Sequence, residues 1–236
     1  MKRTGREGKA GVEMGCTAIL GGTGPEGIGL ALRLAQAGEE VAIGSRDKER
    51  AAAAATRVAD RVRGARVRGD VNEAVIAGAD FVALCFPFGG VEAVVSAHAE
   101  ALAGRIVIDT INPLAVRGGV FHRVRVPEGS AGLLIQRLAP GARVVSAFKT
   151  ISAEHLEHLD TPLEGDVLLC GDDAAAKREV ERLVLRIPNL RPLDTGPLSN
   201  SETVEGITAL LLNLNKRYKA RTSVRIVGIE DPRAKT

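Results

Sequence analysis

The sequence predicts an α/β protein of the Rossmann type: a doubly wound parallel sheet with a smaller C-terminal α/β lobe. Two observations predict it. Strand-like apolar runs alternate with helical patterns along nearly the whole chain, as expected for parallel strands covered by helices on both faces. The first run, "CTAIL", leads into a glycine-rich turn that opens a helical pattern. With 236 residues, 45% of them hydrophobic, the chain can bury one substantial core and a small second lobe.

The alternation gives each expected element its place. Strands are expected at residues 16–20, 40–44, 65–69, 80–87, 105–113, 143–148, 166–171, 190–196 and 224–229, and helices at 27–36, 47–62, 72–79, 89–104, 130–141, 153–159, 172–187 and 199–219. Asp47 stands where the second helix should start and fits an N-cap. Ser199 and Glu202 have the spacing of a capping box at the start of the last helix.

Composition and charge exclude several classes of protein. The net charge is only +3, and one tyrosine and five phenylalanines leave little for stacking on bases, so we expect no nucleic-acid partner. No run approaches the roughly 20 apolar residues of a membrane span, and the polar start lacks the apolar core of a signal peptide. We therefore expect a cytoplasmic protein without a membrane partner, in which residues 1–13 form a disordered leader and residues 230–236 a tail.

The sequence also offers little for a metal ion. The three cysteines are far apart and have no metal-ligand spacing, and Cys85, in an apolar run, is expected to be a reduced, buried thiol. His155 and His158 lie three residues apart beside two glutamates. No third ligand accompanies them, so a mixed-charge exposed helix is the expectation and no metal site is predicted.

The glycine-rich turn "GTGPEG" has the G-x-G-x-x-G spacing of a dinucleotide site, between a strand and a helix. Gly22 permits the tight turn, Gly24 lets the backbone approach a pyrophosphate, and Gly27 lets the helix pack close to the sheet. The N-terminus of the helix would then offer N–H groups and a partial positive charge to the phosphates. The alternative is a glycine-rich turn that binds no ligand.

The end of the second strand indicates which dinucleotide binds. Sites for NAD place an acidic residue there, which would repel a 2′-phosphate, but this chain has Ser45 and Arg46. Serine can donate to that phosphate and arginine can bind it with two hydrogen bonds. Arg50, one helical turn later, adds charge. We therefore predict NADP(H), the alternative for Arg46 being a solvated surface residue.

The nicotinamide is expected over the carboxyl ends of the strands, near residues 86–90 and Asn112. These loops contain no histidine and no evident proton donor, which reduction of a carbonyl would normally need. Lys149 follows the strand "VVSAF" and is the nearest polar candidate. Three roles stay open for it: a polar catalytic group, a binder of an anionic ligand, or one partner of a surface ion pair.

Four segments carry a family resemblance: "LGGTGPEGIGLALRLAQAGEEVAIGSRDKE", "ARVVSAFKTISAEHLEHLD", "DVLLCGDDAAAKREV" and "LRPLDTGPLSNSETVEGITALLLNLN". Together they resemble the NADPH-dependent reductases of the deazaflavin coenzyme F420, from about residue 16 to 229. The resemblance implies hydride transfer between C5 of the deazaflavin and C4 of the nicotinamide. Both partners are hydride carriers, so no catalytic side chain is expected and the protein's task is to align two rings.

The resemblance also implies the binding residues. Contacts to NADP fall on Thr23, Gly24, Pro25, Glu26, Ser45, Arg46, Arg50, Phe86, Gly90 and Asn112, while Lys149 and Ile151 in "FKTISA" lie toward the deazaflavin. The family commonly has His or Asn where Lys149 stands. Residues 14–150 would form the NADP-binding Rossmann domain, and residues 151–229 a C-terminal lobe that completes the deazaflavin cleft.

Two other functions remain open on the sequence. One is an NADP-dependent imine or carbonyl reductase that uses Lys149, and the other is a non-catalytic NADP(H)-sensing protein. The last helix carries leucines at 210, 211, 212 and 214, more than one core-facing stripe needs. We therefore expect a homodimer or a higher homo-oligomer, the alternative being a helix buried within its own subunit.

Overall fold

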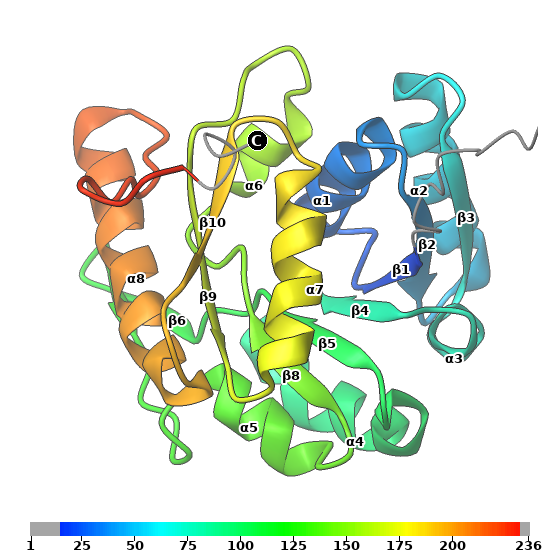
Figure 1. Cartoon of the computed structure of the whole chain (residues 1–236), viewed down its shortest axis with the longest axis horizontal. Coiled ribbons are helices and arrows are strands. Elements are labelled where there is room, and N and C mark those ends of the chain that lie inside the picture. Colours follow the sequence, from blue (N-terminus) through cyan, green and yellow to red (C-terminus); the bar gives the residue numbers. More distant parts are fainter. Residues whose placement is uncertain (1–14, 232–236) are drawn as a thin grey trace, which may run out of the picture.

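The computed structural model describes residues 15–231. The expected leader, residues 1–13, lies outside the described residues, as does most of the expected tail. Figure 1 shows a twisted central sheet with helices on both of its faces. The strands are β1 (Cys16–Leu20), β2 (Glu40–Ser45), β3 (Arg66–Val71), β4 (Phe81–Leu84), β5 (Ile106–Asp109), β6 (Leu114–Arg117), β7 (Val120–Arg123), β8 (Arg143–Ser146), β9 (Gly165–Gly171) and β10 (Leu190–Asp194).

The helices follow the strands in alternation through most of the chain. They are α1 (Pro25–Gln36), α2 (Lys48–Arg61), α3 (Asn72–Ala77), α4 (Val91–Leu102), α5 (Ala131–Leu138), α6 (Ala153–Glu157), α7 (Ala174–Leu185) and α8 (Ser201–Tyr218), with short 3₁₀ turns η1 (Phe88–Gly90) and η2 (Leu198–Asn200). The predicted Rossmann-type fold is confirmed.

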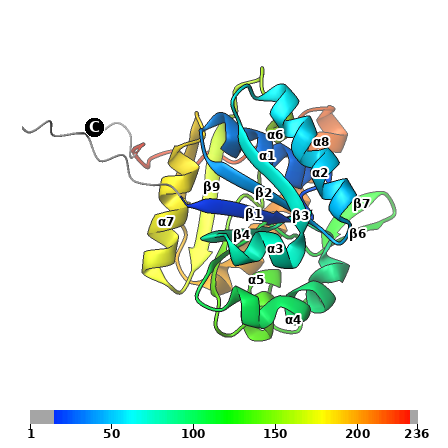
Figure 2. The same cartoon turned by 90° about the vertical axis from the view of Figure 1, so that its right-hand side faces the viewer.

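The sheet has the order β10-β9-β8-β5-β4-β1-β2-β3. One apolar cluster lies between the sheet and the helices α1, α2, α6 and α7, and a second lies under α3, α4 and α5; Figure 2 shows α1 and α2 on one face and α3, α4 and α5 on the other. Alternate residues of one strand serve the two clusters, with Ile19 in the first and Leu20 in the second. This is why the strands read as continuous apolar runs.

The sheet continues past the expected domain boundary near residue 150. β9 pairs with β8 antiparallel, at Val145 opposite Gly171, and β10 then pairs parallel with β9. The second half of the chain therefore extends the same sheet, and two strands run against the direction of the other six. The division into domains 14–150 and 151–229 stays a prediction.

The expected strand at residues 224–229 is wrong. This segment has no strand structure, although Asp166 N donates to Val224 O at 2.7 Å. Asp166 also accepts the Ile226 N–H at 2.6 Å, and the Arg191 guanidinium donates to the Ile226 carbonyl at 2.6 Å. A buried ion pair between Arg191 and Asp166 thus binds the backbone groups that a ladder would have used.

The expected capping box is also wrong. Ser199 lies within η2, and α8 begins after Asn200, which makes no side-chain cap. Glu202 instead pairs with Arg123 at the end of β7. The predicted cap of α2 is confirmed: Asp47 accepts from Glu49 N at 2.9 Å and Arg50 N at 3.1 Å.

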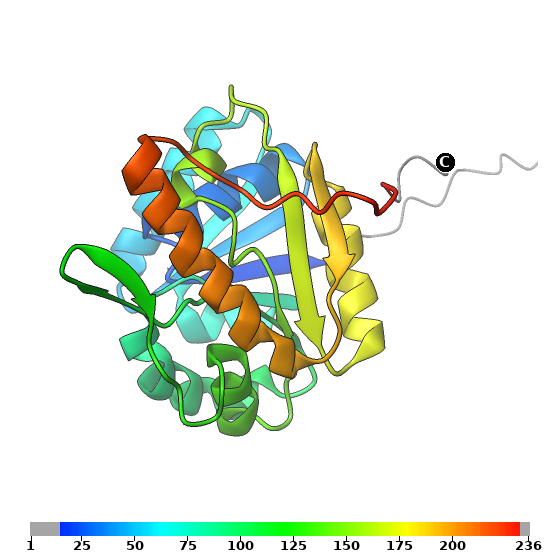
Figure 3. The same ribbon diagram turned by 90° about the vertical axis from the view of Figure 1, so that its left-hand side faces the viewer.

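The hairpin β6–β7 was not predicted, although the sequence carries a signal for it. Gly118 and Gly119 between the strands have φ values of 56° and 76°, the positive values that a two-residue hairpin turn needs. The hairpin lies against α8 (Figure 3). Asn213 accepts from Phe121 N at 2.8 Å and donates to Phe121 O at 2.9 Å.

Candidate functional site

The glycine turn joins β1 to α1 with almost no free space around two of its glycines. A Cβ atom on Gly22 would lie 2.8 Å from the Ile19 carbonyl oxygen, and one on Gly27 would lie 2.5 Å from Gly22 Cα. Neither distance is possible for a real side chain, so these two glycines serve the turn and the packing of the helix. Gly24 differs: a Cβ there would meet only the Gly21 oxygen at an ordinary 3.5 Å.

The space beside Gly24 belongs to a cavity of about 520 Å³ above the carboxyl ends of β1 and β2. Thr23, Ser45, Arg46, Arg50 and Gly90 line it. Arg46 and Arg50 are exposed, and neither forms an ion pair with any described residue. Two free guanidinium groups beside a helix N-terminus favour an anionic ligand.

A second cavity, of about 610 Å³, lies on the other side of the glycine turn. Its walls come from the turn itself, the loops after β4 and β5 with Leu114, residues 149–154 after β8, helix α8 and Thr222. Both cavities are lined by Gly24, Cys85, Phe86 and Pro87, so they meet over the ends of β1 and β4. The strand order reverses between those two strands, which is where doubly wound folds bind ligands.

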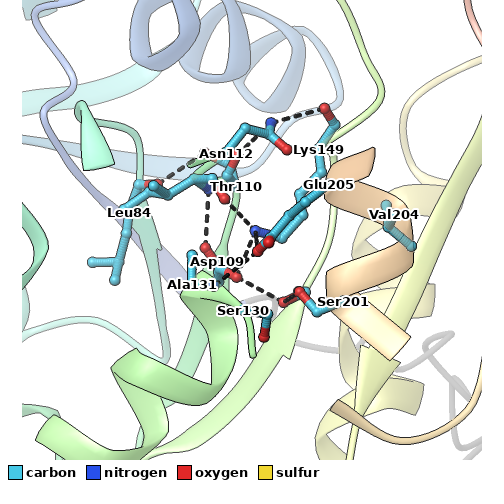
Figure 4. A network of polar contacts seen from close by, with 12 residues as sticks. Leu84, Asp109, Thr110, Asn112, Ser130, Ala131, Lys149, Ser201, Val204 and Glu205 are labelled. Carbon is cyan, nitrogen blue, oxygen red and sulfur yellow. Dashed lines mark hydrogen bonds and ion pairs between the residues drawn. The ribbon is translucent and has the colours of Figure 1, made fainter. Parts of the chain in front are cut away.

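Lys149, which lines the larger cavity, belongs to a buried cluster of charges (Figure 4). Lys149 Nζ is 2.8 Å from Asp109 Oδ2 and 3.3 Å from Glu205 Oε1, and all three side chains are fully buried. The ammonium also donates to the Ile111 carbonyl. Its three N–H groups therefore have three acceptors within the protein.

The two carboxylates of the cluster have further donors. Asp109 accepts from Ser146 Oγ at 2.7 Å and from Ile111 N at 2.9 Å. Glu205 accepts from Ala131 N at 2.9 Å. Burial raises the pKa of Glu205, and the Lys149 charge counteracts it. The cluster ties α8 to the ends of β5 and β8, and this position fixes one wall of the larger cavity.

Glu26, in the first turn of α1, is a carboxylate of a different kind. It lines the larger cavity, is partly exposed and forms no ion pair with a described residue. Loss of water around the carboxyl raises the pKa of Glu26 to about 7, while the Thr110 hydroxyl and the Lys149 charge act in the opposite direction. A carboxyl in this range can gain or lose a proton near neutral pH.

The structure brings together most of the residues that the sequence singled out. Twelve of the fourteen line the two cavities: Thr23, Gly24, Pro25, Glu26, Ser45, Arg46, Arg50, Phe86, Gly90, Asn112, Lys149 and Ile151. Gly22 and Gly27 shape the turn from behind. Lys149 is not in a surface ion pair, which was one of its three open roles, because its side chain is fully buried.

The sequence predicted that the C-terminal lobe completes the cleft, but it did not single out the residues of α8 that form this wall. Thr208, Leu211, Leu212 and Asn215 line the larger cavity from this helix. It also missed Thr150 in that cavity, and Asn72 in the smaller one. Asn72 and Thr150 are polar and buried, but their place in the sequence gives no signal of it.

The other expectations concern metals and membranes. Cys16, Cys85 and Cys170 are free and buried, as Cys85 was expected to be. No group of three or more metal-ligating side chains exists within residues 15–231. The backbone carbonyls of His155 and His158 accept hydrogen bonds from the buried Arg33 guanidinium, at 2.8 and 2.6 Å. Over the same residues, no helix combines the length and apolar character that crossing a membrane requires.

Comparison with known proteins gives consistent matches over nearly the whole chain. A family model described as coenzyme F420-dependent NADP oxidoreductase matches residues 17–113. The F420-dependent NADP reductase of Methanocaldococcus jannaschii is 37% identical over 220 residues, which cover 90% of this chain and 98% of the relative. That of Methanothermobacter marburgensis is 36% identical, with 91% and 99% covered. A solved structure from Arthrobacter sp. FB24, provisionally assigned to the same reductases, superposes with a TM-score of 0.77 at 29% identity, covering 90% of this chain and 99% of the other.

Proposed function

The chain belongs to the F420-dependent NADP reductase family, and from this premise we propose how its two cavities divide the work. The reaction is hydride transfer between NADP(H) and the deazaflavin coenzyme F420. The smaller cavity takes the adenosine 2′-phosphate end of NADP(H). The larger cavity takes the nicotinamide together with the deazaflavin ring. The observation that carries this division is the meeting of the two cavities at Gly24 and Phe86.

The smaller cavity suits a doubly charged phosphate. Ser45, Arg46 and Arg50 provide one hydroxyl and two uncommitted guanidinium groups, and the cap on Asp47 fixes the backbone between them. The N-terminus of α1, with Pro25 at its first position, faces the pyrophosphate with free N–H groups. The open side of Gly24 leaves the volume that the pyrophosphate needs.

The larger cavity suits two stacked rings. Its volume of about 610 Å³ lies within the range of ordinary ligand sites. Phe86, Ile151 and Leu211 offer apolar surface, and Asn112 and Thr150 offer polar atoms. The hydride passes directly between the rings, so the protein contributes alignment and exclusion of water. Lys149 acts in this proposal as a positioning residue, because its ammonium is bound to Asp109, Glu205 and Ile111. That commitment gives no support to Lys149 as the proton donor of an imine or carbonyl reductase.

The test is the selectivity of Arg46→Ala between the two nicotinamide dinucleotides. Loss of a charged hydrogen-bonded contact costs about 1.5–3 kcal/mol, or roughly one to two decades in affinity. The KM for NADP should therefore rise by about 10- to 100-fold, while the KM for NAD should stay almost unchanged. Arg63→Ala, which removes the same charge from an exposed residue just beyond the far end of α2, is the matched control. Equal losses for NADP and NAD would show that Arg46 supports the shared part of the site.

We also propose that the protein is a homodimer or higher homo-oligomer. Leu210 of α8 is 57% exposed and Val116 of the neighbouring hairpin is 59% exposed, which leaves apolar surface to cover. The three free cysteines fit a reducing, cytoplasmic compartment. Light scattering of the purified protein measures the mass, and a monomer at micromolar concentration would contradict the proposal.

A further inference from the structure

We propose that Glu26 takes up the proton released when reduced F420 gives its hydride to NADP, and returns it in the reverse direction. The inference rests on the proposed function of the larger cavity. Hydride transfer alone does not account for this proton. Proton uptake gives Glu26 a task beyond lining the dinucleotide site.

The balance of the reaction requires such a step. Oxidation of the reduced deazaflavin breaks one C–H bond at C5, whose electron pair and hydrogen pass together to C4 of the nicotinamide. It also breaks an N–H bond of the ring, whose electron pair stays in the ring while the proton leaves. Reduced F420 and NADP⁺ thus give F420, NADPH and one proton. In a site that excludes water, the proton needs a base within reach.

The other ionisable groups around the cavity are already committed. Lys149 is bound to Asp109 and Glu205. Glu154 lines the cavity from α6 but is paired with Arg221. Burial holds the pKa of the Cys85 thiol well above its usual range, so this thiol stays protonated.

Glu26, in contrast, forms no ion pair with a described residue. Glu26 lines the cavity close to the place where the two cavities meet, one residue from Pro25 and two from Gly24. The groups that face it are Thr110 and Asp109 from the end of β5, Lys149 after β8 and Cys85 after β4. None of them forms an ion pair with it, so no ion pair has to be broken when the carboxyl takes up a proton.

The same placement predicts a coupling between the charge of Glu26 and the redox state of the nucleotide. The oxidised nicotinamide ring is positive and the reduced ring is neutral. An ionised Glu26 therefore favours NADP⁺, and a protonated Glu26 favours NADPH in comparison. The pKa of Glu26, raised to about 7 in the free protein, puts this change between pH 6 and 8.

The first experiment measures the dissociation constants of NADP⁺ and NADPH from pH 6 to 8 without F420. The 2′-phosphate also titrates in this range, but it is common to both nucleotides and cancels in the ratio of the two constants. In the wild type, the ratio of the NADP⁺ constant to the NADPH constant should fall by roughly threefold to tenfold as the pH rises, since a shift of one pKa unit corresponds to about a factor of ten. In Glu26→Gln the ratio should be independent of pH.

Two further variants serve as controls for this experiment. Glu26→Asp keeps a carboxyl and should keep the pH dependence. This variant tests the proposal even if Glu26→Gln folds poorly. Glu100→Gln removes an exposed carboxylate of α4 that lines neither cavity and should behave as the wild type. A ratio that depends on pH in Glu26→Gln as it does in the wild type would overturn the proposal. So would a pH-independent ratio in the wild type.

The second experiment follows single-turnover oxidation of reduced F420 by NADP⁺. The wild-type rate should rise with pH through about 7, as Glu26 becomes ionised, and this rise should be lost in Glu26→Gln and kept in Glu100→Gln. An unchanged pH profile in Glu26→Gln would remove the proton role while leaving the function intact. If the wild type transferred no hydride between the two substrates, the proposed function itself would fail, whatever the nucleotide ratio shows.

Discussion

Replacing Lys149 with methionine tests whether the buried charge cluster holds the larger cavity together. Methionine keeps nearly the same length but removes the ammonium, so Asp109 and Glu205 lose the cation that lies 2.8 and 3.3 Å from them. Removing one partner of a buried ion pair costs about 3–5 kcal/mol. Asp109 keeps its bonds from Ser146 and Ile111. Glu205 keeps its bond from Ala131 and the Arg123 guanidinium, 3.6 Å from its Oε2. We therefore expect the lower end, a loss of about 3 kcal/mol in the free energy of unfolding.

Urea unfolding followed by circular dichroism measures this loss. With a slope of about 2–3 kcal/mol/M, a loss of about 3 kcal/mol moves the midpoint down by roughly 1–1.5 M. Lys48→Met is the matched control, because Lys48 is 69% exposed and 3.3 Å from Asp70. Breaking this exposed pair should cost less than about 1 kcal/mol.

The pH dependence of the loss separates charge from packing. Burial raises the pKa of Glu205 in the folded protein, so ionising this group costs stability as the pH rises through its folded pKa. Without Lys149 the pKa rises further, and Lys149→Met should lose more stability relative to the wild type at pH 8 than at pH 5. A loss below about 1 kcal/mol, or an equal loss at both pH values, would refute the view that the cluster is held by its charges.

The remaining predictions concern the glycine turn and Thr150. Gly24→Val should leave the unfolding midpoint nearly unchanged and abolish NADP binding in a calorimetric titration. The valine side chain would occupy the cavity without clashing with other protein atoms. Gly27→Val should instead destabilise the fold by more than about 2 kcal/mol, since its Cβ would meet Gly22; equal stability of the two variants would contradict this. Thr150→Val removes a buried hydroxyl without a partner, so stability should hold or rise while KM for NADP or F420 increases; an unchanged KM for both substrates would show that no ligand uses the hydroxyl.

The parts of the site that the sequence predicted depend on neighbours in the chain. The glycine turn, the Asp47 cap and Arg46 lie within about one βαβ unit, where spacing alone decides the geometry. The choice of NADP(H) over NAD(H) needs only the residue type at the end of β2. Such features can be located before any tertiary contact is known.

The parts that it missed depend on contacts between distant segments. Glu205 is 96 residues beyond Asp109, and only the folded chain shows that Lys149 lies between them. The apolar alternation at residues 224–229 is typical of a strand. There, the Asp166 and Arg191 side chains bind the backbone instead. In each case the deciding partner is a polar side chain from elsewhere in the fold, which periodicity does not reveal.

Two buried polar atoms beside the larger cavity, Asn112 Oδ1 and Thr150 Oγ1, lower the stability of the free protein and can favour the binding of a ligand. The Asn112 amide nitrogen donates to the Thr110 and Lys149 carbonyls at 3.3 and 3.0 Å, which fixes the orientation of the amide. Its Oδ1 and the Thr150 Oγ1 are buried, and neither has a hydrogen-bond partner among the described residues. A buried polar atom without a partner costs about 1–3 kcal/mol. A ligand that offers an N–H to the amide oxygen and a polar group to the hydroxyl would recover this energy on binding. The carboxamide of a nicotinamide has both, which is a reason to orient that ring, and not only the deazaflavin, against Asn112 and Thr150.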